Sequence, residues 1–333
     1  MKGILVLMVF WLAFPSASSC LHNEKVIDSR TAVTKLSGLD TIEIPFIYSR
    51  HLVLIKGSIG NLSGYWILDT GAPQLVINNR YATEVVTLQD KLSWDAAGKA
   101  QQIASTTARN IRIGGLHIKR KDVFTVNLST LEKERNVTLL GLVGLQVLIS
   151  YEVIINSSEQ ILLLTKNSRR SNLSINHADA IKIPFKLSAN KMILEAVIGE
   201  RRYKLLFDTG AETSILSRQM VKKCPDHFRL RRYSKLITSN QAIGAAQDGV
   251  INELAISDLL FTNLRVLVHH FEKASQGIDE SIHGAIGYEL LRIGVVHIDF
   301  RGREISIVPM VLNSFRSSEI IKGHPMERPF VIQ

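Results

Sequence analysis

The feature that most constrains this chain is a four-residue sequence that occurs twice, as Asp69-Thr70-Gly71-Ala72 and as Asp208-Thr209-Gly210-Ala211. The two copies are 139 residues apart (208 − 69), and Ile44-Pro45-Phe46 recurs as Ile183-Pro184-Phe185 at the same separation (184 − 45 = 139). Two short motifs that keep both their order and their spacing indicate a duplicated structural unit. We therefore expect the chain to fold as two related halves.

A third pair of segments supports the duplication. Leu140-Gly141-Leu142-Val143-Gly144 corresponds to His283-Gly284-Ala285-Ile286-Gly287 at a separation of 143 (284 − 141), which puts four additional residues in the second copy. The polar segment between the copies has the composition of a surface linker. The expected organisation is a signal peptide (1–19), an N-terminal tether (20–40), a first lobe (41–166), a linker (167–180), a second lobe (181–312) and a tail (313–333).

The apolar stretches within each copy are short and typical of strands. Tyr65-Trp66-Ile67-Leu68 runs directly into Asp69, and Tyr203-Lys204-Leu205-Leu206-Phe207 runs into Asp208. Helical periodicity is confined to 217–223 and 289–292. The sequence therefore predicts an all-β protein with minor helix, built twice.

The residue types of the repeated motif fit a paired site. An Asp at the end of a buried strand must be followed by a sharp turn, which Gly71 and Gly210 permit while letting the backbone approach the carboxylate closely. Thr70 and Thr209 can form hydrogen bonds to the opposite copy and hold the two turns face to face. Two carboxyl groups brought together in this way cannot both ionise easily, so they share one proton.

These motifs resemble the pepsin–retropepsin clan of aspartic peptidases, over nearly all of the chain beyond its N-terminal segment. Besides the two Asp-Thr-Gly-Ala sequences, the resemblance comprises an apolar-apolar-Gly element in each half, Leu142-Val143-Gly144 and Ala285-Ile286-Gly287. The chain is similar in particular to tandem, two-repeat bacterial aspartyl-peptidase-like proteins. This resemblance implies two homologous retropepsin-like β-barrel lobes that form a bilobal, pepsin-like pseudo-dimer with its active site between them. A monomer is expected, since one chain holds both half-sites.

The implied activity is that of an aspartic endopeptidase, in which Asp69 and Asp208 activate a water molecule to hydrolyse polypeptides. It needs no metal and no other cofactor. The resemblance also implies residues that support the dyad, namely Thr70, Gly71, Ala72, Thr209, Gly210 and Ala211. Flap residues that would cover the site are expected between the landmarks of each half, at Trp94, Gly98, Ile243 and Gly244.

One difference from pepsin-like turns bears on the pH range. Those turns usually carry Ser or Thr after the Gly, whereas this chain has Ala72 and Ala211, whose side chains cannot donate a hydrogen bond to the carboxylate. Losing a hydrogen bond to the charged form raises the pKa of a carboxyl group. We therefore expect activity nearer to pH 5 to 6 than to pH 2, an estimate from that principle.

The N-terminus predicts export. A basic start, Met1-Lys2, precedes an apolar run from Gly3 to Phe14 and small residues up to Cys20, which is typical of a signal peptide. Ser18-Ser19-Cys20 resembles a relaxed bacterial lipobox, so cleavage either leaves Cys20 as a lipidated first residue or leaves it as a free thiol. Both alternatives place the protein outside the cytoplasm, in the periplasm, in the cell envelope or secreted, with a membrane anchor in the first case.

Other classes of function find little support in the sequence. The chain has 40 Lys and Arg residues against 30 Asp and Glu, but the positive residues are dispersed and no aromatic platform lies among them, which argues against nucleic-acid binding. No metal-binding spacing of His, Cys and carboxylate residues occurs. Cys224 lacks an assigned His partner and is interpreted as incidental. The alternative that stays open is a non-catalytic protein that uses this fold to bind peptides or envelope components.

Overall fold

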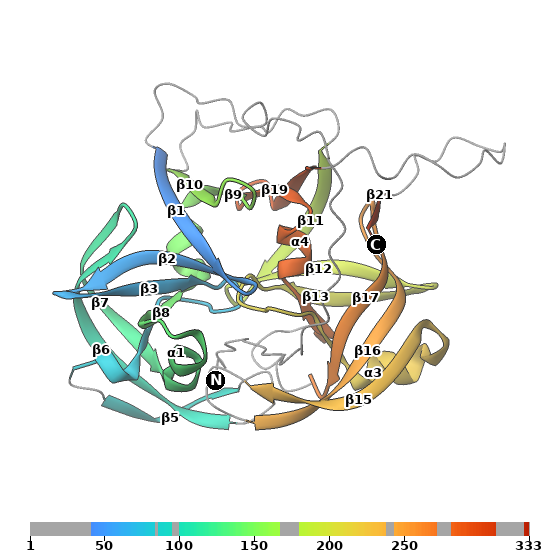
Figure 1. Ribbon diagram of the computed structural model, residues 1–333, viewed down its shortest axis with the longest axis horizontal. Helices are drawn as coiled ribbons and strands as arrows, with labels where there is room; N and C mark the ends of the chain where they lie inside the picture. Colours follow the sequence, from blue (N-terminus) through green and yellow to red (C-terminus); the bar gives the residue numbers. More distant parts are fainter. Residues whose placement is uncertain are drawn as a thin grey trace.

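The computed structural model describes residues 41–83, 86–94, 100–166, 180–237, 243–271, 281–310 and 330–332. Short strands dominate this part of the chain, and its four α-helices have at most seven residues each. Two lobes lie side by side beneath a sheet to which both contribute (Figure 1). The all-β, two-lobed fold predicted from the sequence is confirmed.

The first lobe begins with eight strands and short helices, before two further strands that are described below with the shared sheet. Its elements are β1 (Thr41–Ser49), β2 (Leu52–Ile59), β3 (Leu62–Leu68), β4 (Val76–Asn78), η2 (Asn79–Tyr81), β5 (Val86–Trp94), β6 (Ala100–Ile113), β7 (Leu116–Val126), α1 (Ser129–Arg135), β8 (Leu139–Val143) and α2 (Leu145–Leu148).

The second lobe repeats the order of the strands, with an α-helix added after its fourth strand. Its elements are β11 (Ile181–Ser188), β12 (Lys191–Ile198), β13 (Arg201–Phe207), β14 (Ile215–Ser217), α3 (Arg218–Lys223), η3 (Pro225–His227), β15 (Phe228–Ile237), β16 (Ile243–Ile256), β17 (Leu259–His269), β18 (Gly284–Ile286) and α4 (Tyr288–Leu291). In both lobes the strand that precedes the Asp-Thr-Gly motif runs parallel to the strand of the apolar-apolar-Gly element, β3 with β8 and β13 with β18.

The four additional residues of the second copy lie between β14 and β16. The starts of β4 and β14 differ by 139 (215 − 76), whereas those of β6 and β16 differ by 143 (243 − 100). Helix α3 forms in this interval, and its N-cap Ser217 accepts a hydrogen bond from the backbone N–H of Met220. The insertion therefore leaves the strands around the repeated motif unchanged.

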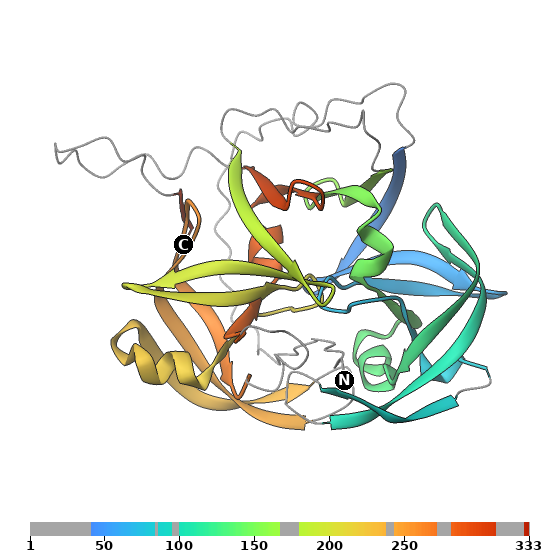
Figure 2. The ribbon, with the colours of Figure 1, turned by 180° about the vertical axis from the view of Figure 1, so that it is seen from behind.

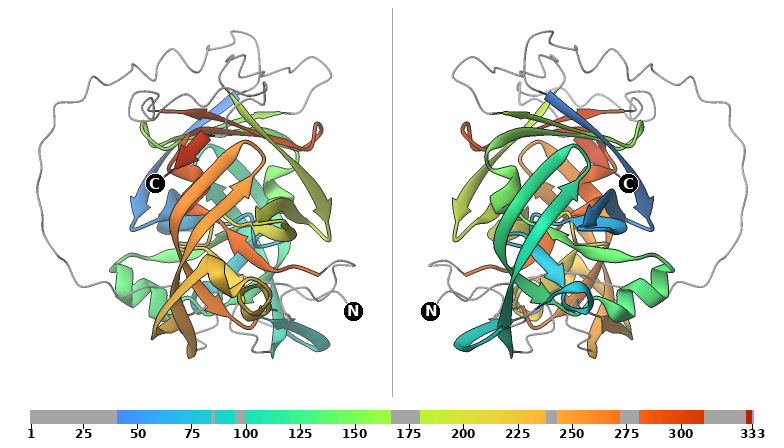
Figure 3. Two further views of the ribbon diagram at one scale, coloured as in Figure 1. Left: turned by 90° about the vertical axis from the view of Figure 1, so that its right-hand side faces the viewer. Right: turned by 90° about the vertical axis from the view of Figure 1, so that its left-hand side faces the viewer.

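A six-stranded antiparallel sheet joins the lobes along their shared edge (Figures 1 and 2). It adds β9 (Tyr151–Asn156), β10 (Ile161–Lys166), β19 (Gly294–Asp299) and β20 (Glu304–Pro309), in the order β1-β10-β9-β19-β20-β11. Its two central strands come from different lobes. In the side views, where one lobe lies in front of the other, strands of this sheet lie above the lobes (Figure 3).

The repeated Ile-Pro-Phe sequence marks the point where a strand changes sheets. Up to Pro45, β1 pairs with β10 of the shared sheet, and from Phe46 onward it pairs with β2 of the first lobe. In the same way, β11 pairs with β20 up to Pro184 and with β12 from Phe185. Proline has no N–H to give to a ladder, so it suits the residue at which one ladder ends and the next begins.

Three short elements differ from the expectations. Helices α1 and α2 were not predicted, because four to seven residues carry too little helical periodicity to be recognised. Within the segment assigned as a tail, β21 (Phe330–Ile332) pairs in parallel with β17. The predicted signal peptide and Cys20 lie outside the described residues. In the part of the chain that is described, no helix has the length and apolar character needed to span a membrane.

Candidate active site

The two Asp-Thr-Gly turns meet where β3 and β13 end, at the boundary of the lobes (Figure 1). The backbone N–H of Asp69 donates to the carbonyl of Val143 at 3.1 Å, and that of Asp208 donates to the carbonyl of Ile286 at 2.9 Å. Each apolar-apolar-Gly element therefore supports the turn of its own lobe. Both Asp side chains are fully buried.

Thr70 and Thr209 link the turns to each other. The Oγ1 of each threonine accepts a hydrogen bond from the backbone N–H of the other, both at 3.0 Å. The same hydroxyl groups donate across the boundary, from Thr70 to the carbonyl of Phe207 at 2.9 Å and from Thr209 to that of Leu68 at 2.8 Å. The structure thus contains the bracing between copies that the sequence predicts.

The glycines of the turns face the carboxyl groups of the opposite lobe. A Cβ atom placed on Gly71 would lie 2.4 Å from Cγ of Asp208, and one on Gly210 would lie 2.6 Å from Cγ of Asp69. Gly287 is equally confined, since a Cβ there would meet the carbonyl oxygen of Asp208 at 1.9 Å. Only residues without a side chain allow the two carboxyl groups to come together.

The carboxyl groups of Asp69 and Asp208 form a coupled pair. Each group acts on the ionisation of the other, and one oxygen of each accepts a hydrogen bond from its own turn, Asp69 Oδ1 from Ala72 N and Asp208 Oδ1 from Gly210 N, both at 2.9 Å. The two Oδ2 atoms have no hydrogen-bond partner among the described residues.

Burial raises the pKa of both groups. The pKa of Asp69 rises to about 6, chiefly because its charged form is desolvated. The pKa of Asp208 is raised by the same cause and by the neighbouring charge of Asp69. Because the charge of one group opposes ionisation of the other, the pair loses its two protons in separate steps and carries one negative charge and one proton between them. A carboxylate that can accept a proton next to a carboxylic acid that can donate one is the pairing needed for general acid–base chemistry.

A cation lies near this pair. Lys191, the first residue of β12, is 2% exposed. The negative charges of Asp208 and Asp69 favour its charged form and so raise its pKa, Asp208 more strongly than Asp69. Burial lowers the pKa of Lys191 to about 8, so its ammonium group stays charged at acidic and neutral pH. Lys191 is not among the site residues predicted from the sequence.

A second group of polar residues joins the lobes beside the turns. Arg135 of α1 pairs with Glu212, which follows the second Asp-Thr-Gly-Ala motif, and both side chains are almost fully buried. His51 Nδ1 lies 2.8 Å from the carbonyl oxygen of Glu212, and its ring stacks on Tyr288 at 3.9 Å between centroids. These contacts fix how the β1–β2 hairpin of one lobe sits on the turn of the other.

The predicted flap residues fall at the tips of two matching hairpins. Trp94 ends β5, opposite Ala100 of β6, and Ile243 begins β16, opposite Ile237 of β15, with Gly244 next to it. The β5–β6 and β15–β16 hairpins approach each other from the two lobes (Figures 1 and 2). Gly98 lies outside the described residues. That these residues form flaps over the site stays a prediction.

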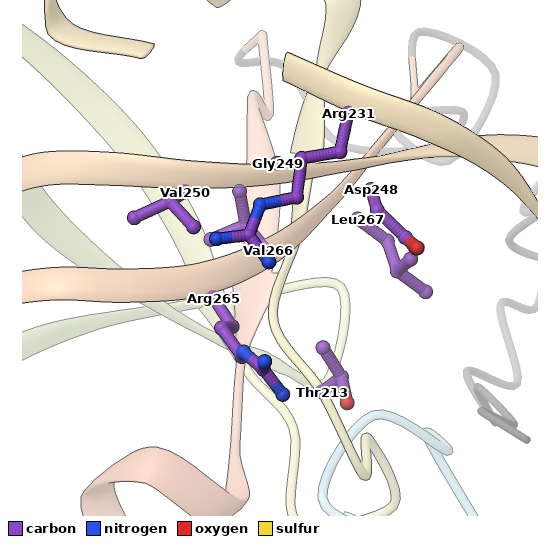
Figure 4. Close-up of a pocket in the computed structure, with 8 residues that line it drawn as sticks. All are labelled: Thr213, Arg231, Asp248, Gly249, Val250, Arg265, Val266 and Leu267. Atoms are coloured by element: carbon purple, nitrogen blue, oxygen red, sulfur yellow. The ribbon is translucent and has the colours of Figure 1, made fainter. Parts of the chain in front are cut away.

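A small pocket opens in the second lobe next to Thr213, three residues beyond Gly210 (Figure 4). The side chains of Arg231 and Arg265 extend into it, with Asp248 at its edge. Because two guanidinium groups outnumber one carboxylate, this pocket suits an anionic group better than an apolar one. No cluster of three potential metal ligands occurs in the described part of the chain.

The residues that sequence reasoning missed are Lys191, Glu212 and Arg135. The sequence does hold a signal for Lys191. The matching position of the first copy, 139 residues earlier, is the apolar Leu52, so the two copies differ in charge at this position. Nothing in the sequence points to the pairing of Glu212 with Arg135, since it depends on how the lobes dock.

Comparison with known proteins places these features in a wider context. Residues 194–279 match the family described as "gag-polyprotein putative aspartyl protease". A search of curated proteins found no match. Among solved structures, aspartic proteinase from Irpex lacteus is 10% identical, with 84% of this chain and 100% of that chain covered and a TM-score of 0.46. Basic 7S globulin from soybean is 9% identical, with 84% and 97% covered and a TM-score of 0.45.

Proposed function

We propose that this chain is an aspartic peptidase of the pepsin and retropepsin clan, an exported endopeptidase that hydrolyses polypeptides with Asp69 and Asp208. The observation that carries the proposal is the pair itself. Two fully buried carboxyl groups that act on each other's ionisation lie at the junction of two braced turns, in a place where each faces a glycine of the opposite lobe. A purely structural site would gain nothing from burying two carboxyl groups together.

The proposed chemistry divides the work between the two groups. In the singly ionised pair, Asp69 acts as the ionised base and Asp208 holds the proton. Asp69 takes a proton from a water molecule as the water oxygen attacks the carbonyl carbon of the substrate, and Asp208 gives its proton to the carbonyl oxygen. When the C–N bond of the resulting diol breaks, the proton on Asp69 passes to the amine, and Asp208 recovers its own proton from a hydroxyl group.

The proposed working range lies near pH 5 to 6, as expected from the sequence, an estimate that follows from the principle that losing a hydrogen bond raises a carboxyl pKa. The pKa of about 6 for Asp69 supports the direction of this expectation, away from pH 2, and favours the upper end of the range, where the pair has lost its first proton. A carboxylate with so raised a pKa is mostly protonated, and hence inactive as a base, at pH 2.

The proposal also covers the surroundings of the site. Substrates would bind in an extended conformation with backbone hydrogen bonds to the β5–β6 and β15–β16 hairpins. The enzyme would act as a monomer outside the cytoplasm, lipid-anchored where Cys20 is modified. These statements rest on the sequence of the N-terminal segment and on the presence of both half-sites in one chain.

The test is digestion of an unfolded protein by the purified chain from Leu21 onward, at pH 3 to 8, with mass spectrometry of the products. Asp69→Asn and Asp208→Asn serve as matched variants, because each removes one ionisable group and keeps the size of the side chain. Cleavage that either substitution abolishes supports the proposal. Folded wild-type protein that cleaves nothing across this range refutes it and favours the peptide-binding alternative.

A further inference from the structure

Lys191 lies inside the protein without a hydrogen-bond partner for its Nζ among the described residues. Removing an ammonium group from water is costly unless nearby charge compensates it. The charged groups that act on Lys191 are the carboxyl groups of Asp208 and Asp69. The proposed catalytic pair therefore supplies the negative charge that compensates the cost of burying this ammonium group.

The strand register explains how the lysine reaches this place. Strands β12 and β13 are antiparallel, with Ile193 opposite Leu206. Continued by two residues, this register sets Lys191 opposite Asp208. Residues that face each other across antiparallel strands project to the same side of the sheet, with Cβ atoms about 5 Å apart. The ammonium group thus extends on the side of the sheet that carries the carboxyl group.

The first lobe has a different residue at the matching position. Leu54 pairs with Ile67 there, so the same continuation sets Leu52 opposite Asp69. Leu52 is 1% exposed and packs in an apolar cluster that includes Ala72. Two nearly symmetric half-sites therefore differ at one buried position, where one lobe has an apolar side chain and the other a cation.

We propose that Lys191 is a charge-positioning residue of the active site, whose buried ammonium group keeps the Asp69–Asp208 pair singly ionised. This inference rests on the proposed function. With Lys191 charged, one carboxylate and one ammonium group cancel, so the buried cluster is neutral in the state that can activate water. Without the cation, the singly ionised pair would be an isolated buried charge, and full protonation would be favoured.

The remaining ionisable groups around the site are engaged elsewhere. Of the buried acids, Glu289 accepts a hydrogen bond from the backbone N–H of Ser214, and Glu212 pairs with Arg135. Asp248 lines the pocket of the second lobe. The other charged side chains on β11, β12, β13 and β16 are exposed or half-buried: Lys182, Lys186, Glu195, Arg201, Arg202, Lys204 and Glu253.

Removing the positive charge of Lys191 should shift the pH dependence of kcat/KM to higher pH. A positive charge lowers the pKa of neighbouring carboxyl groups, so Lys191→Met should raise the pKa of both ionisation steps of the pair. Both limbs of the profile of kcat/KM against pH then move to higher pH, by about one unit or more. At pH 5 this corresponds to a loss of roughly tenfold in kcat/KM. Lys191→Arg keeps the charge and should leave both limbs near those of the wild type.

The experiment compares wild type, Lys191→Met, Lys191→Gln and Lys191→Arg by kcat/KM from pH 3 to 8 on one peptide substrate. The Gln variant is a second neutral side chain, in case the Met variant does not fold. Leu52→Met is the control for changing the matching buried position without changing charge. In parallel, the carboxyl carbons of Asp69 and Asp208 are titrated by ¹³C NMR in the same proteins, with Asp69→Asn and Asp208→Asn providing the assignments.

The proposal is supported if both limbs of the pH profile lie at higher pH in the neutral variants and stay in place in Lys191→Arg and Leu52→Met. Folded neutral variants with the wild-type limbs and the wild-type carboxyl titration overturn it, while cleavage by the wild type leaves the proposed function intact. If the wild type cleaves nothing, the proposed function fails. The NMR titration then still decides whether Lys191 controls the ionisation of the pair.

Discussion

Thr70 and Thr209 each accept a hydrogen bond from the backbone N–H of the other at 3.0 Å, although 139 residues separate them in sequence. Both hydroxyl groups also donate to a carbonyl of the opposite lobe, so four hydrogen bonds cross the boundary at the site. All four lie in the buried interior, where an unpaired N–H or C=O group is expensive. The site and the junction of the lobes are therefore the same structure.

Replacing one of these hydroxyl groups should weaken the whole molecule. In Thr209→Val, the N–H of Thr70 loses its acceptor and the carbonyl of Leu68 loses its donor. We expect the free energy of unfolding to fall by about 2 to 4 kcal/mol, since each buried polar group left unpaired costs about 1 to 3 kcal/mol. Denaturant unfolding measures it, with Thr209→Ser as the control that retains the hydroxyl group. Equal stability of the Val and Ser variants would contradict the bracing role.

Gly71→Ala should remove activity with a smaller effect on folding. The added methyl group would lie 2.4 Å from Cγ of Asp208, so the carboxyl group must move out of its place. A displacement of about 1 Å at a catalytic group can cost on the order of a hundredfold in rate. The measurement is kcat/KM at the pH of best activity. Gly249→Ala is the matched control, because its nearest contact would be 3.3 Å away on a flexible leucine side chain.

The sequence predicted the parts of this fold that repeat. The Asp-Thr-Gly motif and the apolar-apolar-Gly element could be recognised because each occurs twice at related spacing, and the structure brings them together in both lobes. The recurring Ile-Pro-Phe was also noticed. Its meaning became clear only from the register, in which Pro45 and Pro184 stand where β1 and β11 change sheets.

What the sequence could not show depends on departures from the repeat and on docking. Lys191 differs from Leu52 at the matching position of the first copy, but a lysine at the start of a strand is usually solvated, and only the register of β12 and β13, continued by two residues, sets it opposite Asp208. Arg135 meets Glu212 from a different lobe, a contact 77 residues apart that no local pattern encodes. The strand Phe330–Ile332 is too short to distinguish from a tail by its sequence.

Asp208→Asn should make the protein inactive and, at neutral pH, more stable. The pKa of Asp208 is raised by burial and by Asp69, so its contribution to stability is present below the unfolded pKa near 4 and is lost as the pH rises through the folded pKa. An uncharged Asn avoids this loss. We expect the variant to gain on the order of 1 kcal/mol or more at pH 7 and little at pH 4. Urea unfolding at both values tests this, and a gain that does not grow with pH would be evidence against it.

His297 should make the junction between the lobes sensitive to acid. It lies on β19 of the shared sheet, 7% exposed, with Nε2 3.6 Å from Glu152, and burial lowers its pKa. A histidine with a lowered folded pKa stabilises above the unfolded value near 6.5, and this stabilisation is lost as the pH falls. Relative to His297→Gln, the wild type should lose on the order of 1 kcal/mol between pH 7.5 and pH 5. The exposed His117, changed to Gln, serves as the control and should show no such difference.

The ion pair of Arg135 and Glu212 should be costly to break from one side. Its side chains are 2% and 5% exposed, so removing one partner leaves an uncompensated charge inside the protein. We expect Arg135→Met to lower the free energy of unfolding by about 3 kcal/mol or more. The double variant with Glu212→Met should recover part of that loss, because it removes both charges. Arg202, 76% exposed and paired with Glu195, provides the contrast, and Arg202→Ala should change stability by less than about 1 kcal/mol. Chemical denaturation of the four proteins measures these differences, and a double variant no more stable than Arg135→Met would show that packing, and not the buried charge, determines the cost.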